Sequence, residues 1–261
     1  MHANFTALVA LVLSLGAFAM VYRWSNAQPV KVRLGVLLVF TLCSVPSFLF
    51  VAYYLHVVPE RAWFYTLHAW RGAEFLVIFA GGAAGCAASF LPRILLAFPL
   101  FLLIAAATVP YLKPLLAPLP DGALGDHWKG DACLQSTSST CGPASICTIL
   151  KSMGIPATER EAALACYSYG GGTEAWYLAR YVGSKGGTAL FDFRKSFAPE
   201  VGLPALVGVH IGGVGHFIAV LSVRGDEVRF ADPLVGEETL SLEKFRKRYQ
   251  FTGFHMSVAR N

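Results

Sequence analysis

The chain has 261 residues, of which 55% are hydrophobic and only 14% are charged. Ordinary soluble domains carry about 25% charged residues, so this composition excludes a soluble cytosolic domain, and it is too apolar for a disordered chain. The net charge of +5 falls entirely in residues 1–117, whereas residues 118–261 hold 14 basic and 14 acidic side chains. The excess basic residues lie scattered between apolar segments, which excludes the clustered patch of a nucleic-acid-binding protein.

The first half of the chain has the pattern of a membrane domain. A helix needs about 20 apolar residues to cross the hydrocarbon core of a bilayer, and long apolar stretches recur up to residue 117. We predict four transmembrane helices, at about residues 5–24, 34–57, 73–91 and 94–112. The third is rich in glycine and alanine, which suits close packing of helices in lipid.

Basic residues between the predicted helices indicate an orientation. Arg23, Lys31 and Arg33 make the short loop after the first helix the densest basic cluster, and such loops stay in the cytoplasm. An even number of spans then places both termini outside. We therefore expect a multi-pass protein of a bacterial inner or plasma membrane, with its second half extracytoplasmic.

A linker rich in proline and glycine, residues 118–130, separates the membrane domain (residues 1–117) from residues 131–261. The pattern of residues 131–261 predicts a mixed α and β domain, because segments with helical periodicity alternate with segments rich in β-branched residues. Helices are predicted at residues 141–153, 158–166, 173–182 and 240–249, and strands at 206–210, 217–223, 227–231 and 253–258.

Cys141 is the strongest candidate for a catalytic residue. It lies in the first turn of a predicted helix, where unpaired backbone N–H groups and the positive end of the helix dipole stabilise a thiolate. The thiolate is the nucleophilic form of cysteine, and Gly142 beside it leaves room for a substrate backbone. A single cysteine is more often a small buried side chain, so the hypothesis needs partner residues.

Three residues could complete a site around Cys141. His216 follows a glycine-rich turn at the start of a predicted strand and could act as the base. The hairpin that follows returns Asp232 to the side of His216, where its carboxylate would orient the imidazole. Gln135 precedes Cys141 by six positions, and its amide could join the backbone N–H of Cys141 in stabilising an oxyanion.

The order Gln, Cys, His, Asp and the spacing of these residues match a papain-like arrangement. The chain resembles the papain-like cysteine peptidase domain of bacteriocin-processing exporters, which remove double-glycine leader peptides. The resemblance extends over about residues 131–252, and the first half shows no such match. The matching segments are Gln135–Ala144, Gly172-Thr173, Gly215–Leu221, Val228–Pro233, Gly236 and Leu240–Phe245.

The resemblance implies an α+β papain-like cysteine peptidase domain that follows an all-α membrane domain of about four transmembrane helices. In that family's mechanism, Cys141 would be the nucleophile and His216 the general base and then the acid. Asp232 would orient the imidazole, and Gln135 would stabilise the oxyanion. The expected substrate-binding residues lie beside these groups, at Gly172, Thr173 and Gly215.

The chain also departs from those exporters. Its peptidase-like region follows the membrane region instead of preceding it, no phosphate-binding loop of an ATPase occurs, and Thr140 stands where an aspartate often precedes the nucleophile. We therefore expect hydrolysis of a peptide bond in exported or membrane-associated peptides. Cleavage after small residues or a Gly-Gly pair is the narrower expectation.

Two other functions stay open at this point. A cysteine-dependent acyltransferase or transpeptidase at the membrane surface would use the same thioester with an amine as acceptor. A non-catalytic peptide-binding module would use the scaffold alone, although degenerate members usually lose the cysteine or the histidine. The expected partners are a peptide or protein substrate and the lipid bilayer, with no nucleic acid, no ATP and no cofactor.

The remaining cysteines do not suggest a metal centre. Neither a C-x-x-C nor an H-E-x-x-H motif occurs, so we expect no metal site. Outside the cytoplasm, two of Cys133, Cys147 and Cys166 could form a disulfide. We expect the pair Cys133 and Cys166, since it would tether the segment before Cys141.

Overall fold

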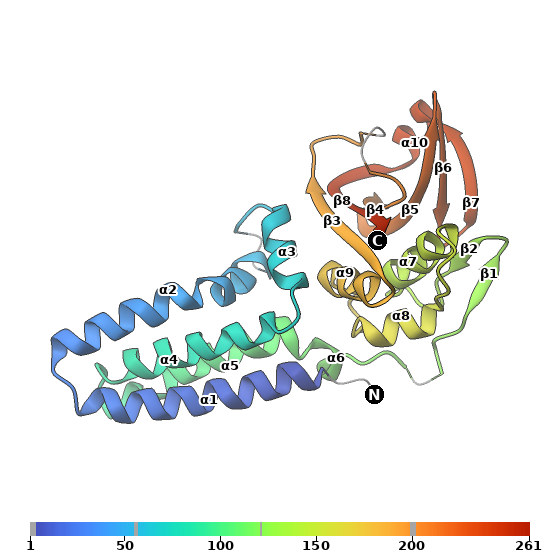
Figure 1. Ribbon diagram of the computed structural model, residues 1–261. Coiled ribbons are helices and arrows are strands. Elements are labelled where there is room, and N and C mark those ends of the chain that lie inside the picture. Colours follow the sequence, from blue (N-terminus) through green and yellow to red (C-terminus); the bar gives the residue numbers. More distant parts are fainter. Residues whose placement is uncertain (1–3, 55–56, 121, 199–201) are drawn as a thin grey trace. The chain divides into compact units, whose positions relative to one another are not determined.

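The computed structural model describes residues 4–54, 57–120, 122–198 and 202–261. The chain divides into two compact units (Figure 1). A helical unit comprises Ala3–Glu60 and Arg71–Leu116, and a sheet unit comprises Arg61–Trp70 and Ala117–Asn261. Residues 61–70 thus belong to the sheet unit, although they fall within the predicted membrane domain, residues 1–117, as a loop between two predicted spans.

The helical unit contains helices only among its described residues. They are α1 (Phe5–Asn26), α2 (Val30–Tyr54), the 3-10 turn η1 (Ala73–Leu76), α4 (Val77–Ala88), the 3-10 turn η2 (Arg93–Leu95), α5 (Ala97–Tyr111) and α6 (Lys113–Leu116). Asn4 caps α1, because its side-chain oxygen accepts a hydrogen bond from the N–H of Ala7 at 3.0 Å, which satisfies one of the free donors at the helix start.

Two helices of this unit are long and apolar enough to cross a membrane by length and composition. They are α1 and α2, whose mean hydropathies reach 2.2 and 2.4. A third span would be a broken one, made of α3 (Ala62–Ala69) and the helical segment Ala73–Ala88, and Arg93–Ala107 is a shorter apolar helix. These N-terminal helices indicate membrane association, and the four-span arrangement stays a prediction.

The close packing expected for the glycine-rich segment is present between α1 and α4. A Cβ atom at Gly81 would lie 2.2 Å from the carbonyl oxygen of Ser14, and one at Gly85 would lie 2.3 Å from that of Phe18. Only glycine permits such a close approach of two backbones. These two positions therefore hold the two helices together.

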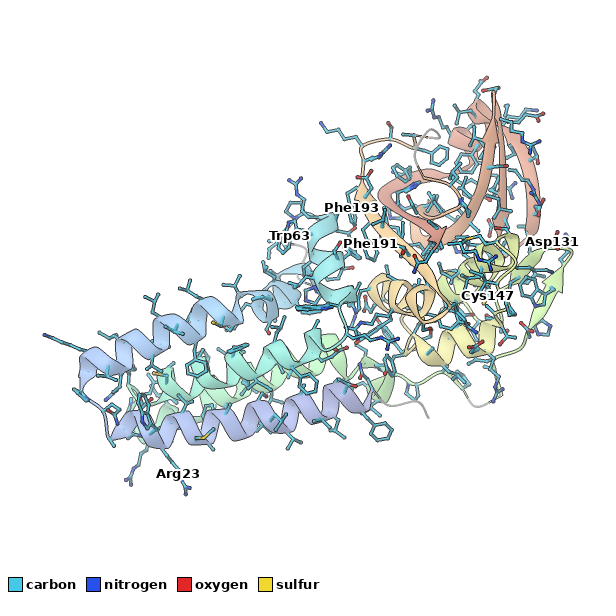
Figure 2. The ribbon with its side chains drawn as sticks, viewed as in Figure 1. Arg23, Trp63, Asp131, Cys147, Phe191 and Phe193 are labelled. Atoms are coloured by element: carbon cyan, nitrogen blue, oxygen red, sulfur yellow. The ribbon has the colours of Figure 1, made fainter. Side chains whose placement is uncertain are left out.

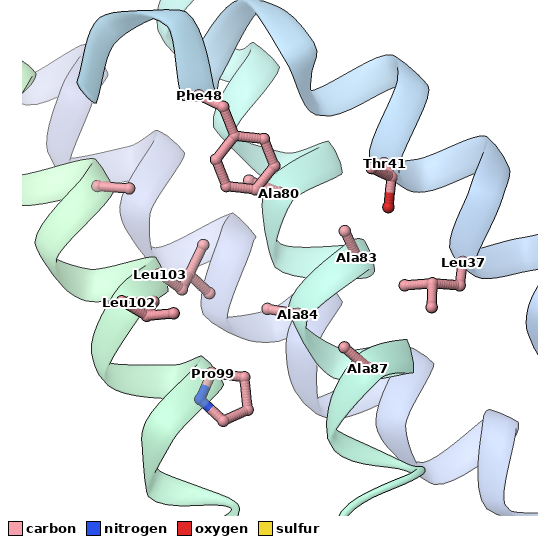
Figure 3. A pocket seen from close by; sticks show the side chains of 11 residues that line it. Leu37, Thr41, Phe48, Ala80, Ala83, Ala84, Ala87, Pro99, Leu102 and Leu103 are labelled. Carbon is pink, nitrogen blue, oxygen red and sulfur yellow. The ribbon is translucent and has the colours of Figure 1, made fainter. Parts of the chain in front are cut away.

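A pocket of about 220 Å³ lies between α2, α4 and α5 (Figure 3). Alanines of α4, among them Ala80, Ala83 and Ala87, form one wall, and Thr41 of α2 is the polar residue among the lining side chains. None of the described residues that line the pocket is ionisable. The pocket thus offers no group for acid–base chemistry.

The sheet unit is built on one six-stranded antiparallel sheet in the order β3-β8-β4-β5-β6-β7. The strands are β3 (Gly187–Phe193), β4 (Ala205–Ile211), β5 (Val214–Arg224), β6 (Glu227–Asp232), β7 (Gly236–Ser241) and β8 (Gln250–Arg260). The helices are α3, α7 (Cys141–Ser152), α8 (Glu159–Ala165), α9 (Ala175–Ser184) and α10 (Leu242–Arg248), and a short hairpin joins β1 (His127–Lys129) to β2 (Ala132–Leu134).

The predicted helices and strands of this region are all present, with changed ends. The helix expected from residue 173 begins at Ala175, and the strand expected at 217–223 begins at Val214. The sequence analysis did not predict β1, β2, β3 or β7. Strands β1 and β2 have only three residues each, too few to show an alternation of apolar and polar residues. Strand β7, Gly236–Ser241, is polar and shows no such alternation either.

Helices α7 and α10 cover opposite faces of the sheet. Phe217 of β5 lies beside Gly142 of α7, whereas the next residue, Ile218, packs in a buried cluster with Phe245 of α10. Neighbouring residues of a strand point to opposite faces, so the two helices lie on different sides. A hydrogen bond of 3.1 Å from the hydroxyl of Ser145 to the carbonyl of Phe217 fixes α7 against the start of β5.

The expected disulfide between Cys133 and Cys166 is wrong, because all six cysteines are free thiols. The nearby thiol of Cys133 together with burial raises the pKa of Cys147 well above its usual value. Burial also raises the pKa of Cys166. Thiols of this kind are protonated and enclosed, which makes them inert.

Candidate active site

Cys141 is the first residue of α7, and the loop before it is held in place by hydrogen bonds. Thr140 is the N-cap residue and is fully buried. Its hydroxyl accepts a hydrogen bond from the N–H of Thr137 at 3.1 Å and donates to the carbonyl of Thr137 at 3.1 Å. Cys141 itself is half-buried, so its sulfur lies at the positive end of α7 within reach of solvent.

The sheet brings His216 and Asp232 together. His216 lies near the start of β5 and Asp232 at the end of β6, and these strands pair antiparallel with Ala219 opposite Ala231. The Nε2 atom of His216 is 2.9 Å from Oδ1 of Asp232. The thiol of Cys141 also lies close enough to His216 to raise the pKa of the imidazole. The three predicted residues therefore lie together, and the hairpin places Asp232 beside His216 as expected.

Electrostatics favour a charged imidazole at this site. Burial by itself lowers the pKa of His216, but hydrogen bonds with Asp232 and Cys141 outweigh it and raise the pKa to about 9. Burial by itself raises the pKa of Asp232, yet hydrogen bonds from His216, from the N–H of Leu234 and from Tyr249 hold it below its usual range. An imidazolium beside a carboxylate is thus the stable state at neutral pH.

Gln135 lies at the same edge of the sheet. Its backbone N–H donates to the carbonyl of Pro233 at 2.9 Å, next to Asp232, and its side-chain Nε2 donates to the carbonyl of Thr137 at 2.8 Å. The amide therefore borders the loop that carries Cys141. A side-chain amide beside a nucleophile at a helix N-terminus is an arrangement that can stabilise an oxyanion.

Comparison with known families agrees with this geometry. Residues 130–261 match the model of the Peptidase C39 family. The chain belongs to this family. The resemblance found in the sequence is confirmed, and the protein is a cysteine peptidase with a papain-like α+β domain behind two N-terminal apolar helices.

Two individual relatives match about half of this chain. An uncharacterized protein of Methanothermobacter thermautotrophicus is 32% identical over 133 residues, which cover 49% of this chain and 87% of that protein. The probable functional amyloid protease FapD of Pseudomonas aeruginosa is 28% identical over 126 residues, covering 45% of this chain and 56% of FapD.

Two solved peptidase domains are also similar to this C39 peptidase. The peptidase domain of Streptococcus ComA, a bifunctional ABC transporter of a quorum-sensing pathway, is 20% identical and covers 49% of this chain and 96% of its own, with a TM-score of 0.42. A double-glycine motif protease from an AMS/PCAT transporter, solved in complex with the leader peptide, is 19% identical to this chain. The match covers 56% of this chain and 99% of that protease domain, with a TM-score of 0.43.

Tyr249 is a member of the peptidase's site that the sequence analysis missed. It follows the last residue of α10 and is buried. Its hydroxyl donates to Oδ2 of Asp232 at 2.7 Å, while Oδ1 accepts from His216 and from the N–H of Leu234 at 2.9 Å. Burial and the nearby carboxylate raise the pKa of Tyr249, so the hydroxyl stays a donor. In sequence, it is only an aromatic residue at a helix end.

Glu159 is a second missed residue. Its carboxylate is fully buried and accepts hydrogen bonds from the backbone N–H of Ser136, at 2.7 Å, and from the hydroxyl of Ser136. Ser136 follows Gln135, so this contact fixes the segment that leads to Cys141. The sequence signal was read as the capping box of α8, in which Thr158 does accept from the N–H of Glu161 at 3.2 Å.

The three predicted substrate-binding residues border the site in different ways. The hydroxyl of Thr173 contacts that of Ser168 at 2.6 Å and donates to the carbonyl of Ser139 at 3.4 Å. Thr173 therefore tightens the loop beside Cys141. Gly172 precedes it with φ of +124°, which favours glycine. Gly215 is exposed, and a Cβ atom there would meet open space. Contact of these residues with substrate stays a prediction.

Proposed function

We propose that this C39 peptidase hydrolyses a peptide bond through a thioester, with Cys141 as nucleophile and His216 as general base and then acid. Asp232 orients the imidazole, and the side chain of Gln135 with the backbone N–H of Cys141 forms the oxyanion hole. The observation that carries the proposal is the position of His216, which lies 2.9 Å from Asp232 and close enough to the Cys141 thiol for that thiol to raise its pKa.

The reaction follows from these contacts. The thiolate of Cys141 attacks the carbonyl carbon, and the oxyanion that forms accepts hydrogen bonds from Gln135 and the Cys141 N–H. When the C–N bond breaks, His216 donates its proton to the leaving amine and a thioester remains. His216 then takes a proton from water, whose oxygen attacks the thioester. The C–S bond then breaks, the acid product leaves, and the thiolate of Cys141 beside the protonated His216 is restored.

The Nε2 atom of His216 pairs with Asp232, so Nδ1 is the ring nitrogen available to exchange protons with the sulfur and the leaving group. Because the carboxylate is buried and holds its charge, it stabilises the imidazolium at the moment when the thiolate reacts. The division of roles between the two nitrogens is thereby set by Asp232.

The proposed substrate is an exported or membrane-associated peptide, cut after small residues or a Gly-Gly pair. Two apolar helices on the same chain support a site that works beside a membrane. The four-span arrangement with an extracytoplasmic sheet unit belongs to this proposal, since Arg23, Lys31 and Arg33, at the facing ends of α1 and α2, favour that orientation.

The test compares protein N-termini in envelopes of cells that carry the wild-type protein or its Cys141→Ala variant. New N-termini that depend on Cys141 are expected, and the residues before each cut reveal the specificity. Cys43→Ala is the matched control, because Cys43 is an exposed thiol in the helical unit. Identical N-termini with wild type and Cys141→Ala, at equal expression and insertion, would overturn the proposal. Products whose mass includes an amine in place of water would show acyl transfer instead.

A further inference from the structure

Helix α3 is embedded in the sheet unit, although its residues lie between apolar helices in the chain. One of its faces is buried, with Phe64, Tyr65 and His68 exposing 4%, 3% and 1% of their surface. The opposite face carries Trp63, which is 56% exposed. Figure 2 labels Trp63 on α3 and Phe191 and Phe193 on the neighbouring strand β3. Helix α3 is thus amphipathic with respect to the sheet unit.

Tyr65 is the centre of an aromatic cluster. Its ring lies 5.4 and 5.1 Å from those of Phe191 and Phe193 on β3, and 5.6 Å from that of Phe254 on β8. It also lies 5.8 Å from the ring of Trp176 on α9. Tilted contacts at these separations are favourable beyond the area that they bury. The cluster therefore fixes α3 to a helix and two strands at once.

Arg180 of α9 fixes the other end of the contact. Its guanidinium donates hydrogen bonds to the carbonyls of His68 at 2.7 Å, Ala69 at 3.2 Å and Trp70 at 2.8 Å. The last carbonyls of a helix have no partner inside it, and they lie at the negative end of its dipole. A planar, charged fork of donors is suited to that position. Arg180 thus ties α9 to α3.

The elements held by α3 pack against the start of α7, the helix that begins with Cys141. A Cβ atom at Gly142 would lie 2.9 Å from Cδ1 of Leu178 and 3.4 Å from Cδ2 of Phe217. Leu178 lies on α9 between Trp176 and Arg180, both of which contact α3. The ring of Phe217 is 5.1 Å from that of Phe254, which packs on Tyr65. Both side chains that border Gly142 are therefore one contact away from residues that α3 holds.

We infer that α3 is a positioning element of the peptidase, which holds the start of α7, and with it Cys141, in place through α9 and Phe254. Packed interiors transmit displacements from one side chain to the next, so loosening α3 should loosen the packing of Leu178 and Phe217 against the start of α7. The region that matches the peptidase family begins at residue 130. The start of α7 is thus supported by a segment of the chain that precedes the family domain and connects two apolar helices.

The inference rests on Cys141 being the nucleophile, and the test measures the space around its sulfur without any substrate. In the full-length protein in detergent, the rates of alkylation of Cys141 by iodoacetamide and by the bulkier N-ethylmaleimide are followed by peptide mass spectrometry. Tyr65→Ala removes the central ring, and Arg180→Gln removes the charged fork. In both variants, the alkylation rate with the bulky reagent divided by that with the small reagent should rise about threefold or more, since the start of α7 can then yield.

Control variants distinguish a loosened start of α7 from an unfolded protein. Trp63→Ala changes the exposed face of the same helix and should leave the ratio unchanged, and Tyr65→Phe, which keeps the ring, should restore it. Cys147 is buried on α7, so it must stay unmodified in every variant that is compared. If Tyr65→Ala exposes Cys147, Arg180→Gln alone decides the test. An unchanged ratio with Cys147 protected, or an equal rise in Trp63→Ala, would overturn the inference. Neither result depends on which peptide the enzyme cleaves.

Discussion

The helical unit and the sheet unit are stabilised in opposite ways. In the helical unit, α1 and α4 meet through the backbones at Gly81 and Gly85, and the pocket between the helices is lined by apolar side chains. In the sheet unit, buried ionisable groups are paired, as Asp232 and Glu159 are. Apolar packing tolerates many sequences of the same size and shape, whereas removal of one partner of a buried charged group is strongly destabilising. We therefore expect substitutions in the packing of the helical unit to lower stability without changing the chemistry, and substitutions of the buried charged groups in the sheet unit to change the site.

The largest expected effect is that of Asp232→Asn. The amide can still contact His216 but supplies no charge to stabilise the imidazolium, so the rate should fall by about 10⁴-fold, as for the same change in the serine-protease triad. The pH profile reports the cause. In the wild type, His216 has a pKa of about 9, so it is protonated below that pH and activity should fall as pH rises through it. Without the carboxylate, burial lowers this pKa, and the alkaline limb should move to lower pH.

Glu237→Gln is the matched control for Asp232→Asn. Glu237 pairs with Arg229 at 2.6 Å on the neighbouring strands, and both side chains are partly exposed. Exposed ion pairs contribute about 0–1 kcal/mol, so the rate and the alkaline limb should match the wild type. The comparison is made on kcat/KM against pH with one peptide substrate. An alkaline limb that stays in place in Asp232→Asn would contradict the role given to the pair.

In the helical unit, Gly85→Leu should destabilise without touching the chemistry. A side chain there meets the carbonyl oxygen of Phe18, and forcing atoms into a packed interface costs about 1–3 kcal/mol. Gly16→Leu is the control, because a Cβ atom at Gly16 has nothing within 4 Å. Thermal unfolding in detergent should show a lower Tm for Gly85→Leu only. An equal loss for both variants, or a changed alkylation rate of Cys141 in the folded fraction, would oppose this separation.

The sequence predicted those parts of the molecule whose signal is local. Cys141 at the start of a helix, the Thr158 cap and the hairpin that returns Asp232 to His216 depend on residues close in the chain, and the structure contains each of them. Strands β5 and β6 were predicted from their β-branched residues and from the turn between them, which is also a local signal. Local patterns are reliable where a turn or a cap fixes the backbone.

The parts that escaped prediction depend on contacts between distant segments. Tyr249 reaches Asp232 only because α10 packs on the sheet, and Glu159 reaches Ser136 across the loop before α7. Residues 61–70 are apolar and lie between long apolar stretches, so their pattern favours a membrane location. Their place in the sheet unit follows from Tyr65 and Arg180, and no local rule connects those two residues.

Glu159→Gln should have an intermediate effect and lies wholly in the sheet unit. The amide has one acceptor where the carboxylate had two, so one donor of Ser136 loses its partner, and a hydrogen bond to a charged group is worth about 1.5–3 kcal/mol. Glu161→Gln on the same helix is the control, since Glu161 forms a partly exposed ion pair with Lys185 at 2.7 Å. Urea unfolding should show the loss in Glu159→Gln and almost none in Glu161→Gln. Equal stability of the two variants would mean that Glu159 does not stabilise the loop that leads to Cys141.

The smallest expected effect is that of Tyr249→Phe, which removes one hydroxyl and keeps the ring packed on Phe230 and Phe245. Asp232 loses one of the hydrogen bonds that keep it ionised, which should cost about 1 kcal/mol. A carboxylate that holds its charge less firmly stabilises the imidazolium less, so the alkaline limb should move slightly to lower pH. The expected fall in kcat/KM is a few-fold.

A double-mutant cycle decides whether Tyr249 acts through Asp232. In the Asp232→Asn background there is no carboxylate to hold, so Tyr249→Phe should cause no further shift of the alkaline limb. A shift of the same size in both backgrounds would mean that the hydroxyl acts on His216 by another route. Loss of stability alone cannot imitate the expected result, because the position of the limb is measured on the folded enzyme. The cycle therefore separates a buried hydroxyl that serves packing from one that sets the charge of the site.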